Sequence, residues 1–260
     1  MLDERSKYLR RQIIRALKGG GRGHVGSSFS LVEIMRVLYD DVLRPDDICI
    51  LSKGHGCLAQ YVMLVEKGLI DAKELDSFCR EGALLGGHPE NHIPGIAAST
   101  GSLGHGLSIG LGMALAQRMR GGAGRLFVIV GDGEINEGSI WEAALCAGKH
   151  KLSNLTVIVD YNKRQSYGTV ASVQPLEPLD RKWDSFGWFV NGCDGHDVSQ
   201  LRSMLGELKV ESDMTMSRRP RALICHTVKG KGIPEIENHP LWHHKDVFTP
   251  EDAVRLEAAL

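Results

Sequence analysis

The chain has 260 residues, of which 24% are charged and 42% hydrophobic, as is typical of soluble globular proteins. Its 31 Lys and Arg residues nearly balance its 32 Asp and Glu residues, so it lacks the positive field that nucleic-acid binding requires. The charged N-terminus is not expected to act as a signal peptide, and no apolar run reaches the roughly 20 residues of a membrane span. Six scattered cysteines without a CxxC pair favour reduced thiols, and hence a cytoplasmic protein.

The N-terminal third of the sequence predicts helices, one strand and an irregular segment. Residues 2–18 carry apolar side chains four apart, which predicts an amphipathic helix that ends at three glycines. Ser30 followed by Glu33 matches a capping box, so another helix is expected to begin there. The remaining elements expected in this part are a buried strand, a helix, a helix cap and an irregular segment: residues 47–51, 54–67, Asp71 with Glu74, and 80–100.

The rest of the sequence predicts strands that alternate with helices. Residues 125–130 and 155–159 are unbroken apolar runs, which are typical of parallel sheets covered on both faces. Thr249 before Pro250 predicts a capped terminal helix. Further helices are expected at 103–119, 141–147 and 201–208, and further strands at 188–190 and 221–225. The prediction is one α/β domain over residues 1–260, with a mostly parallel sheet flanked by helices on both faces and a ligand at the carboxyl ends of the strands.

Two polar residues follow the two central strands. Asp132 comes after the strand at 125–130, between Gly131 and Gly133, and Asn162 comes after the strand at 155–159. One carboxylate and one amide oxygen at the same sheet edge suit Mg²⁺, which takes further ligands from phosphates and water. The flanking glycines would let phosphate oxygens approach the backbone N–H groups. The alternative is a tight turn in which Asp132 only caps the next helix.

Other phosphate-binding motifs are not found in the sequence. It contains no GxxxxGK[ST] segment, which argues against a P-loop enzyme. Gly104 and Gly106 do not continue as GxGxxG, because the next glycine, Gly110, comes too late. A dinucleotide site is therefore not expected.

Five histidines lie in segments that are expected to be loops: His24, His55, His88, His105 and His243. Imidazoles suit both phosphate binding and proton transfer near neutral pH. A zinc site is the competing interpretation, but the sequence has neither HxxxH nor HExxH, and no Cys and His pair at ligand spacing.

Taken together, these motifs resemble those of a known family. Gly131-Asp132-Gly133, then 28 residues and Asn162, resembles the GDG…N signature of thiamine-diphosphate enzymes. The flanking motifs narrow the resemblance to transketolases, and the matching segments follow in the expected order: Gly23-His24-Val25-Gly26, Leu51-Ser52-Lys53-Gly54-His55, Gly87-His88-Pro89-Glu90, Thr100-Gly101-Ser102-Leu103-Gly104-His105-Gly106, Glu137-Gly138 and Trp242-His243.

The resemblance implies a role for each matching residue. Asp132, Asn162 and the backbone carbonyl of Arg164 would ligate Mg²⁺. The residues expected to bind or border thiamine diphosphate are His55, Gly101, Ser102, Leu103, Gly131, Asp132, Gly133, Glu137, Asn162 and His243, with Glu137 also at a subunit interface. The substrate channel would be lined by His24, His88 and His243, which would act in catalysis by binding sugar hydroxyls and moving protons.

The resemblance covers only the first of three transketolase domains. The glutamate that activates the cofactor belongs to the pyrimidine-binding domain, which has no counterpart in this sequence. The chain is therefore expected to be inactive alone and to work with a second subunit, most simply in an α2β2 heterotetramer. The complex would transfer a two-carbon ketol unit from a ketose or ketose phosphate to an aldose or aldose phosphate.

Three departures from the family pattern concern the substrate. Val25 replaces a proline, Ser166 stands where an apolar residue usually packs, and His244 replaces a glycine. The resemblance places the residues that recognise the substrate phosphate largely on the missing half. Two alternatives stay open, a related enzyme that uses a 2-oxo acid donor for decarboxylation or acyloin formation, and a non-catalytic relative.

Overall fold

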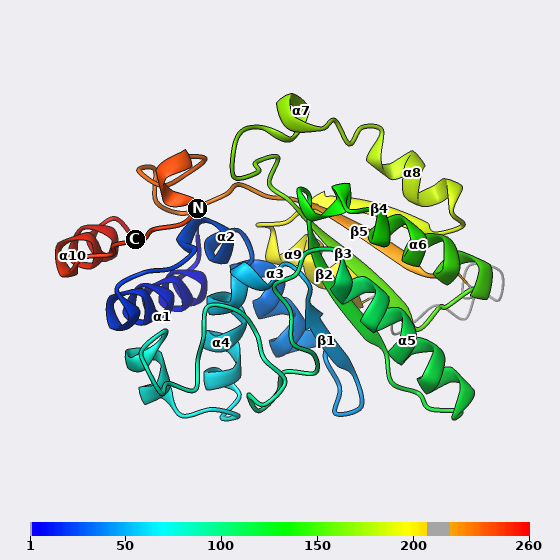
Figure 1. Cartoon of the computed structure of the whole chain (residues 1–260), viewed down its shortest axis with the longest axis horizontal. Helices are drawn as coiled ribbons and strands as arrows, with labels where there is room; N and C mark the ends of the chain where they lie inside the picture. The colour runs from blue at the N-terminus through cyan, green and yellow to red at the C-terminus, as the bar shows by residue number, and fades with distance from the viewer. Residues whose placement is uncertain (1, 207–218) are drawn as a thin grey trace.

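The computed structural model describes residues 2–206 and 219–260, and its centre is a five-stranded parallel sheet (Figure 1). The strands lie in the order β1-β2-β3-β5-β4, and every neighbouring pair is parallel. Their bounds are Ile48–Leu51 for β1, Leu126–Gly131 for β2, Leu155–Tyr161 for β3, Phe189–Asp194 for β4 and Arg221–His226 for β5. The predicted parallel sheet is confirmed.

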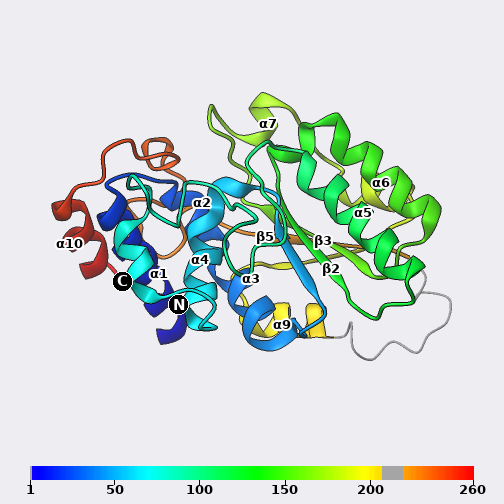
Figure 2. The same cartoon turned by 60° about the horizontal axis from the view of Figure 1, so that its bottom comes forward.

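Helices cover both faces of the sheet. Side chains alternate between the two faces along each strand, so each strand contributes apolar side chains to two separate cores. Phe127 and Ile129 of β2 point into one core, and Val128 and Val130 point into the other. The first core packs against α1 (Glu4–Gly20), α2 (Val25–Ser30), α3 (Val32–Val37), α4 (Cys57–Glu66) and α9 (Val198–Gly206). The second packs against α5 (His105–Met119), α6 (Gly138–His150) and α8 (Leu179–Ser185). Figure 2 shows α5 and α6 on one side of the sheet and α3, α4 and α9 on the other.

Shorter elements complete the described chain. α7 (Val170–Val173) follows β3, and α10 (Pro250–Ala258) packs beside α1. Short segments of 3₁₀ or π geometry are η1 (Leu38–Val42), η2 (Gly54–Gly56), η3 (Ala72–Ser77), η4 (Glu134–Asn136) and η6 (Pro240–Trp242). None of the helices that the structure describes combines the length and the apolar composition of a membrane span.

Most predicted helix ends agree with the structure. Gly21 ends α1 in the left-handed conformation, with φ at 69°. The side chain of Asp71 accepts a hydrogen bond from the backbone of Lys73 and caps η3. Thr249 and Asp252 form a capping box at the start of α10. Residues 80–100 are irregular as expected. The helix predicted at 201–208 is α9, and residues 207 and 208 lie outside the described residues.

The capping box predicted at Ser30 and Glu33 is wrong. Ser30 is the last residue of α2, and its hydroxyl donates to the buried carboxylate of Asp160 at 2.6 Å and lies 2.9 Å from the backbone carbonyl oxygen of Ser27. Glu33 lies inside α3, where Arg10 holds its carboxylate. Both side chains have tertiary partners, and these displace the local cap.

Candidate cofactor and substrate site

Loops after four neighbouring strands surround a large cavity. Because β1, β2, β3 and β5 are parallel neighbours, the segments that follow them meet at one edge of the sheet. The cavity there has a volume of about 750 Å³, and we call it the strand-end cavity. Charged and amide side chains of the lining come from all four loops, and they include Lys53 after β1, Asp132, Glu134 and Glu137 after β2, Asn162 and Arg164 after β3, and Lys229 after β5.

The two residues predicted to hold Mg²⁺ lie in this lining, and both are buried. The carboxylate of Asp132 accepts hydrogen bonds from the backbone N–H groups of Gly133, at 2.8 Å, and Lys163, at 2.5 Å. The amide oxygen of Asn162 accepts from the backbone N–H of Arg164 at 3.0 Å. Since an ionised carboxylate offers about four lone-pair sites, these bonds fix the oxygens and leave capacity for a cation.

The surroundings of Asp132 favour a bound cation. Burial raises the pKa of Asp132 to about 6, and the charge of Asp160 acts in the same direction. A divalent cation would offset this effect. Within the described residues, no three His, Cys, Asp or Glu side chains are grouped to hold a metal together. Mg²⁺ fits such a site, because it is commonly held by one or two carboxylates while phosphates and water supply the other ligands. The Arg164 carbonyl, the third expected ligand, lies 3.5 Å from the Lys229 ammonium.

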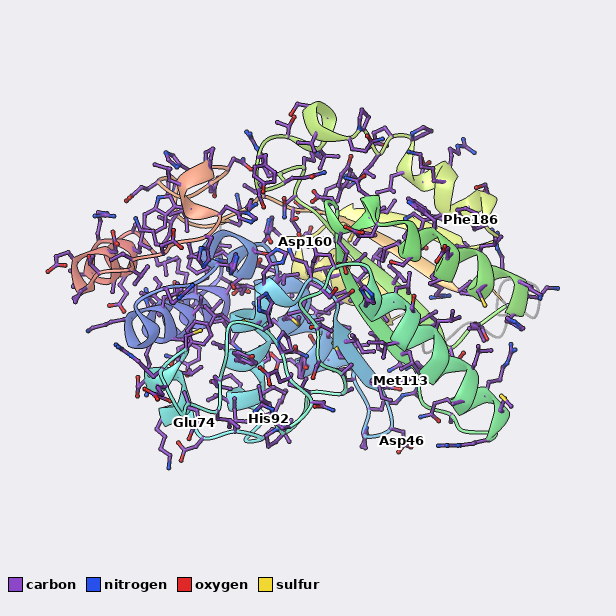
Figure 3. All side chains as sticks on the ribbon, viewed as in Figure 1. Asp46, Glu74, His92, Met113, Asp160 and Phe186 are labelled. Carbon is purple, nitrogen blue, oxygen red and sulfur yellow. The ribbon has the colours of Figure 1, made fainter. Side chains whose placement is uncertain are left out.

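Lys53 is held by a buried acidic partner. Asp160 lies near the middle of the molecule at the end of β3, as Figure 3 shows. Its carboxylate accepts from the Lys53 ammonium at 2.5 Å, from Ser30 at 2.6 Å and from the Thr227 hydroxyl. Although burial raises the pKa of Asp160, Lys53 and the hydroxyl donors lower it below its ordinary value. The motifs of the sequence assign Lys53 and Asp160 no role; a lysine in a glycine-rich loop directly after a buried strand is the signal that could have found the pair.

Lys229 and His243 form a second cationic group in the cavity. The Lys229 ammonium donates to Nδ1 of His243, and Nε2 of His243 lies 2.9 Å from the Ser166 hydroxyl. Because an ammonium has no acceptor, Nδ1 must be unprotonated, and the hydrogen of this neutral imidazole is on Nε2. Burial and the charge of Lys229 lower the pKa of His243 to about 4. Burial and the charge of Lys53 lower the pKa of Lys229 to about 8.

Two polar atoms in the lining have no partner. Ser27 Oγ and Gln165 Nε2 are buried, and neither makes a hydrogen bond within the described structure. Buried polar atoms are almost always paired, so these two are suited to contact a polar ligand. With the cations Lys53 and Lys229 and the oxygens of Asp132 and Asn162, the lining fits a diphosphate ester bound with Mg²⁺.

Glu134 joins three loops of the site, although no motif of the sequence points to it. Its carboxylate accepts from the Ser52 hydroxyl, from the backbone N–H of Gly104 at 2.9 Å and from that of Gly131 at 3.0 Å. Gly104 adopts φ of 86°, and a Cβ there would lie 2.5 Å from Ser139 Oγ. Only glycine therefore suits this turn, which brings the loop before α5 against the loop after β2.

Four of the five predicted loop histidines cluster, and His244 joins them. The ring centroid of His24 lies 5.3 Å from that of His55, 6.4 Å from His88, 5.7 Å from His243 and 4.4 Å from His244. Burial, with its charged and histidine neighbours, lowers the pKa of His24 to about 3. Burial and Lys53 hold the pKa of His55 well below its ordinary value.

His105 does not join this cluster. It begins α5 on the surface and lies 3.3 Å from the Ser102 hydroxyl. Ser102 is exposed and lies outside the strand-end lining. The other expected cofactor residues, including Gly101, Leu103, Gly131, Gly133 and Glu137, do line the cavity.

A second cavity adjoins the first. It has a volume of about 410 Å³ and shares His24 and His55 with the strand-end cavity. Its own lining includes Arg22, Arg80 and His88. We call it the arginine cavity. The predicted channel histidines are thus divided: His243 lines the strand-end cavity, His88 lines the arginine cavity, and His24 lines both.

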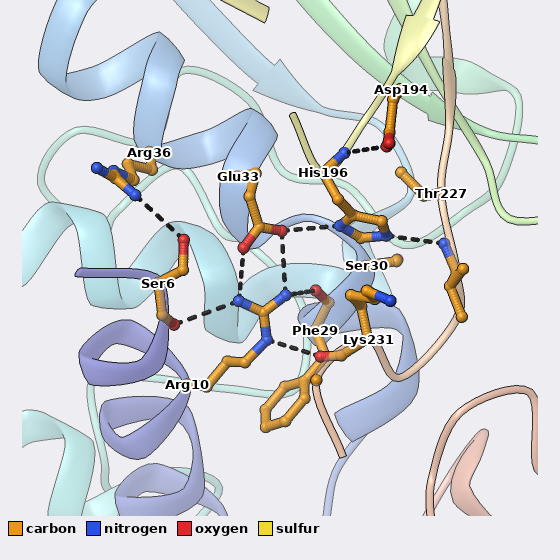
Figure 4. Close-up of polar contacts among 12 residues, drawn as sticks. Ser6, Arg10, Phe29, Ser30, Glu33, Arg36, Asp194, His196, Thr227 and Lys231 are labelled. Atoms are coloured by element: carbon orange, nitrogen blue, oxygen red, sulfur yellow. Dashed lines mark hydrogen bonds and ion pairs between the residues drawn. The ribbon is translucent and has the colours of Figure 1, made fainter. Parts of the chain in front are cut away.

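A buried network supports the segment after β5, which Figure 4 shows at Thr227 and Lys231. Arg10 of α1 donates to both carboxylate oxygens of Glu33, at 2.6 and 3.0 Å. His196 donates from Nδ1 to Glu33 at 2.9 Å, and its Nε2 accepts from the backbone N–H of Val228 at 2.8 Å. Although burial opposes ionisation, Arg10 and His196 lower the pKa of Glu33 to about 2. The network therefore connects α1 and α3 to the segment beside Lys229.

Comparison with known proteins establishes the family. The family described as "Transketolase, thiamine diphosphate binding domain" matches residues 3–251. The chain belongs to the transketolase family, and the resemblance noted in the sequence is confirmed. Its fold is also that of a solved Pichia stipitis transketolase, with a TM-score of 0.88 at 25% identity, covering 98% of this chain and 40% of that one.

Several relatives are single subunits of about the same extent. The chain is 40% identical to one subunit of the apulose-4-phosphate transketolase of Actinobacillus succinogenes, over 94% of this chain and 90% of that protein. It is 38% identical to one subunit, SqwG, of the 6-deoxy-6-sulfo-D-fructose transketolase of a Clostridium species, over 89% of this chain and 86% of that protein. It is 34% identical to rat transketolase, of which it covers 40%.

Proposed function

We propose that residues 1–260 form the diphosphate-binding domain and N-terminal subunit of a two-component transketolase. With a second subunit, it transfers a two-carbon ketol unit from a ketose or ketose phosphate to an aldose or aldose phosphate. The observation that carries this proposal is the pair Asp132 and Asn162, buried at neighbouring strand ends in a cavity that also holds Lys53 and Lys229. Membership of the transketolase family supports the reaction class.

Different residues of the strand-end cavity would bind the metal ion and the diphosphate of the cofactor. Asp132, Asn162 and the carbonyl of Arg164 would hold Mg²⁺, and Lys53, Lys229 and the buried imidazoles would balance the charge of the diphosphate. When bound, thiamine diphosphate supplies the carbon nucleophile and the electron sink, which side chains do not provide. The protein fixes the diphosphate against rigid loops, and the Glu134 bonds between these loops limit their movement.

The histidines supply proton transfer and substrate binding. His24, His88 and His243 are neutral near pH 7, because burial lowers the pKa of each. A neutral imidazole can accept a proton from a sugar hydroxyl and return it later, as we propose for His24 and His88. His243, whose Nδ1 already accepts from Lys229, can bind a hydroxyl by donating from Nε2. His24 lies at the junction of the two cavities, where it can contact a substrate that extends from one into the other.

The second subunit would complete the site. Leu103 is 36% exposed and Glu137 is exposed, although both line the cavity, so they are available to a partner chain. We propose that this partner supplies the pyrimidine-binding domain and its activating glutamate in an α2β2 heterotetramer. Relatives named as subunits support a two-chain enzyme. The six unpaired cysteines agree with a reducing compartment, and we place the protein in the cytoplasm.

The proposal is tested by Mg²⁺-dependent binding of thiamine diphosphate to the chain co-purified with its second subunit, to be sought as an adjacent reading frame with a pyrimidine-domain pattern. Asp132→Ala should weaken binding roughly a hundredfold or more, because it removes the charged metal ligand. Asp180→Ala, which removes a 61% exposed carboxylate on α8, should leave binding unchanged. Equal binding by the wild type and Asp132→Ala would contradict the assignment. Transfer from a ketose phosphate, compared with turnover of pyruvate, tests the reaction class.

A further inference from the structure

The arginine cavity has a strongly one-sided lining. Its titratable side chains, apart from two cysteines, are two arginines and four histidines: Arg22, Arg80, His24, His55, His88 and His244. Neither an aspartate nor a glutamate belongs to this lining. The charge of Glu90 opposes the lowering of the pKa of His88 by burial, and Asp246 pairs with His244 at 2.8 Å. Both carboxylates lie outside the lining. Such a cavity favours an anion.

The two arginines are not committed to protein partners. Arg80 donates from Nε to the carbonyl oxygen of Gly19 at 2.6 Å, and no described residue accepts from its two terminal nitrogens. Arg22 makes neither a hydrogen bond nor an ion pair with the described residues. Elsewhere, Arg10 and Arg125 pair with buried carboxylates. The guanidinium donors of Arg22 and Arg80 therefore remain available to a ligand.

The arginines line a cavity that adjoins the proposed cofactor site. This cavity meets the strand-end cavity at His24 and His55. A linear molecule that reacts in the strand-end cavity and extends past His24 would bring its far end to Arg22 and Arg80. Two guanidinium groups offer paired N–H donors that match the oxygens of a tetrahedral anion.

We propose that Arg22 and Arg80 bind the anionic end of the substrate, a tetrahedral oxyanion such as a phosphate or sulfonate, remote from the reacting carbonyl. This inference rests on the proposed function and extends it. It gives this chain its own part in recognising the charged group, a role that the family resemblance places largely on the other half of the enzyme.

Direct binding tests the proposal independently of catalysis. Inorganic phosphate and methanesulfonate are titrated calorimetrically into the co-purified complex, saturated with thiamine diphosphate and Mg²⁺ so that the strand-end cavity is filled, at low ionic strength, with wild type and Arg22→Gln/Arg80→Gln. At least one of the two anions should bind the wild type, and the double variant should bind it roughly tenfold more weakly or worse. Arg181→Gln, which removes a 79% exposed arginine on α8, is the matched control and should not change binding. Absence of binding to wild type, or equal binding to the double variant, would overturn the proposal.

Steady-state kinetics then distinguish a phosphate from a sulfonate ligand, and they test the anion site separately from the proposed function. With D-fructose 6-phosphate, 6-deoxy-6-sulfo-D-fructose and D-fructose as donors, the double variant should raise KM roughly tenfold for the anionic donor that the wild type prefers. It should leave turnover of D-fructose and binding of thiamine diphosphate unchanged. Equal losses with charged and uncharged donors would refute a specific anion site. Anion binding that depends on the arginines, without ketol transfer by the wild type, would refute only the proposed function.

Discussion

The two adjoining cavities differ in how their charges are balanced. In the strand-end cavity, the cation Lys53 is matched by the buried carboxylate of Asp160, and the structure holds both before any ligand binds. In the arginine cavity, Arg22 and Arg80 have no acidic partner among the described residues. Lys53 and Asp160 are buried, whereas Arg22 and Arg80 are exposed. A site at strand ends can therefore be rigid and preorganised, whereas the adjoining cavity leaves charge for a ligand to neutralise.

The largest expected difference between the cavities is in folding stability. Lys53→Met leaves Asp160 buried without its counter-charge, which should lower the free energy of unfolding by about 3–5 kcal/mol. Arg80→Gln removes an exposed side chain with one bond to a backbone carbonyl, and its effect should stay within about 0.5 kcal/mol. Urea denaturation of both variants and of the wild type measures this contrast. Equal losses in the two variants would show that the cavities do not differ in this way.

The next prediction is a pH dependence of folding stability that comes from His24, which lines both cavities, and His243, which lines the strand-end cavity. The pKa of His24 is lowered to about 3 and that of His243 to about 4, so the unfolded chain binds more protons than the folded chain between about pH 6.5 and 4. Stability should therefore fall as pH decreases through this window, by about 2 kcal/mol for the two groups after allowance for their partial exposure. Asp132 acts in the opposite direction, because its raised pKa means that the folded state takes up a proton near pH 6.

The double variant His24→Asn/His243→Asn isolates this effect. Urea denaturation at pH 7 and pH 4.5 should show a smaller acid-induced loss in the variant than in the wild type. Arg22→Gln should retain the wild-type loss, because Arg22 belongs to the arginine cavity alone. The same loss in the histidine variant and the wild type would contradict the assignment.

The last prediction concerns a close contact between residues of the two cavities. Gly101 has φ of 139°, and a Cβ there would lie 3.0 Å from the ring of His88. Gly101→Ala should therefore cost about 1–3 kcal/mol, near the lower end if His88 moves away. Gly112→Ala places a methyl group in open space on α5 and should stabilise the chain by about 0.5–1 kcal/mol. Thermal denaturation of the two variants should give shifts of opposite sign; a stabilising Gly101→Ala would show that this contact is not strained.

Part of the site could be predicted because its residues follow recognisable strands. Asp132 and Asn162 come directly after apolar runs, and the parallel arrangement of those runs brings the two residues to the same edge. The pairing of Lys53 with Asp160 could not be predicted, because 107 residues separate them. At Ser30 the sequence predicted a local interaction that the structure does not form. The local pattern matched a helix cap, but the tertiary structure gave the Ser30 hydroxyl to Asp160.

The sequence by itself determined the alternation of strands and helices, the strand-end positions of Asp132 and Asn162, and the transketolase family. These features depend on hydrophobic periodicity and on short motifs, which are local properties of the chain. Only the tertiary structure decided which charges are paired and which remain free. Lys53 finds Asp160 in the core, while Arg22 and Arg80, from separate loops, line one cavity without an acidic partner in its lining. Charge neutralisation depends on which distant segments meet, and the periodicity of a sequence does not contain that information.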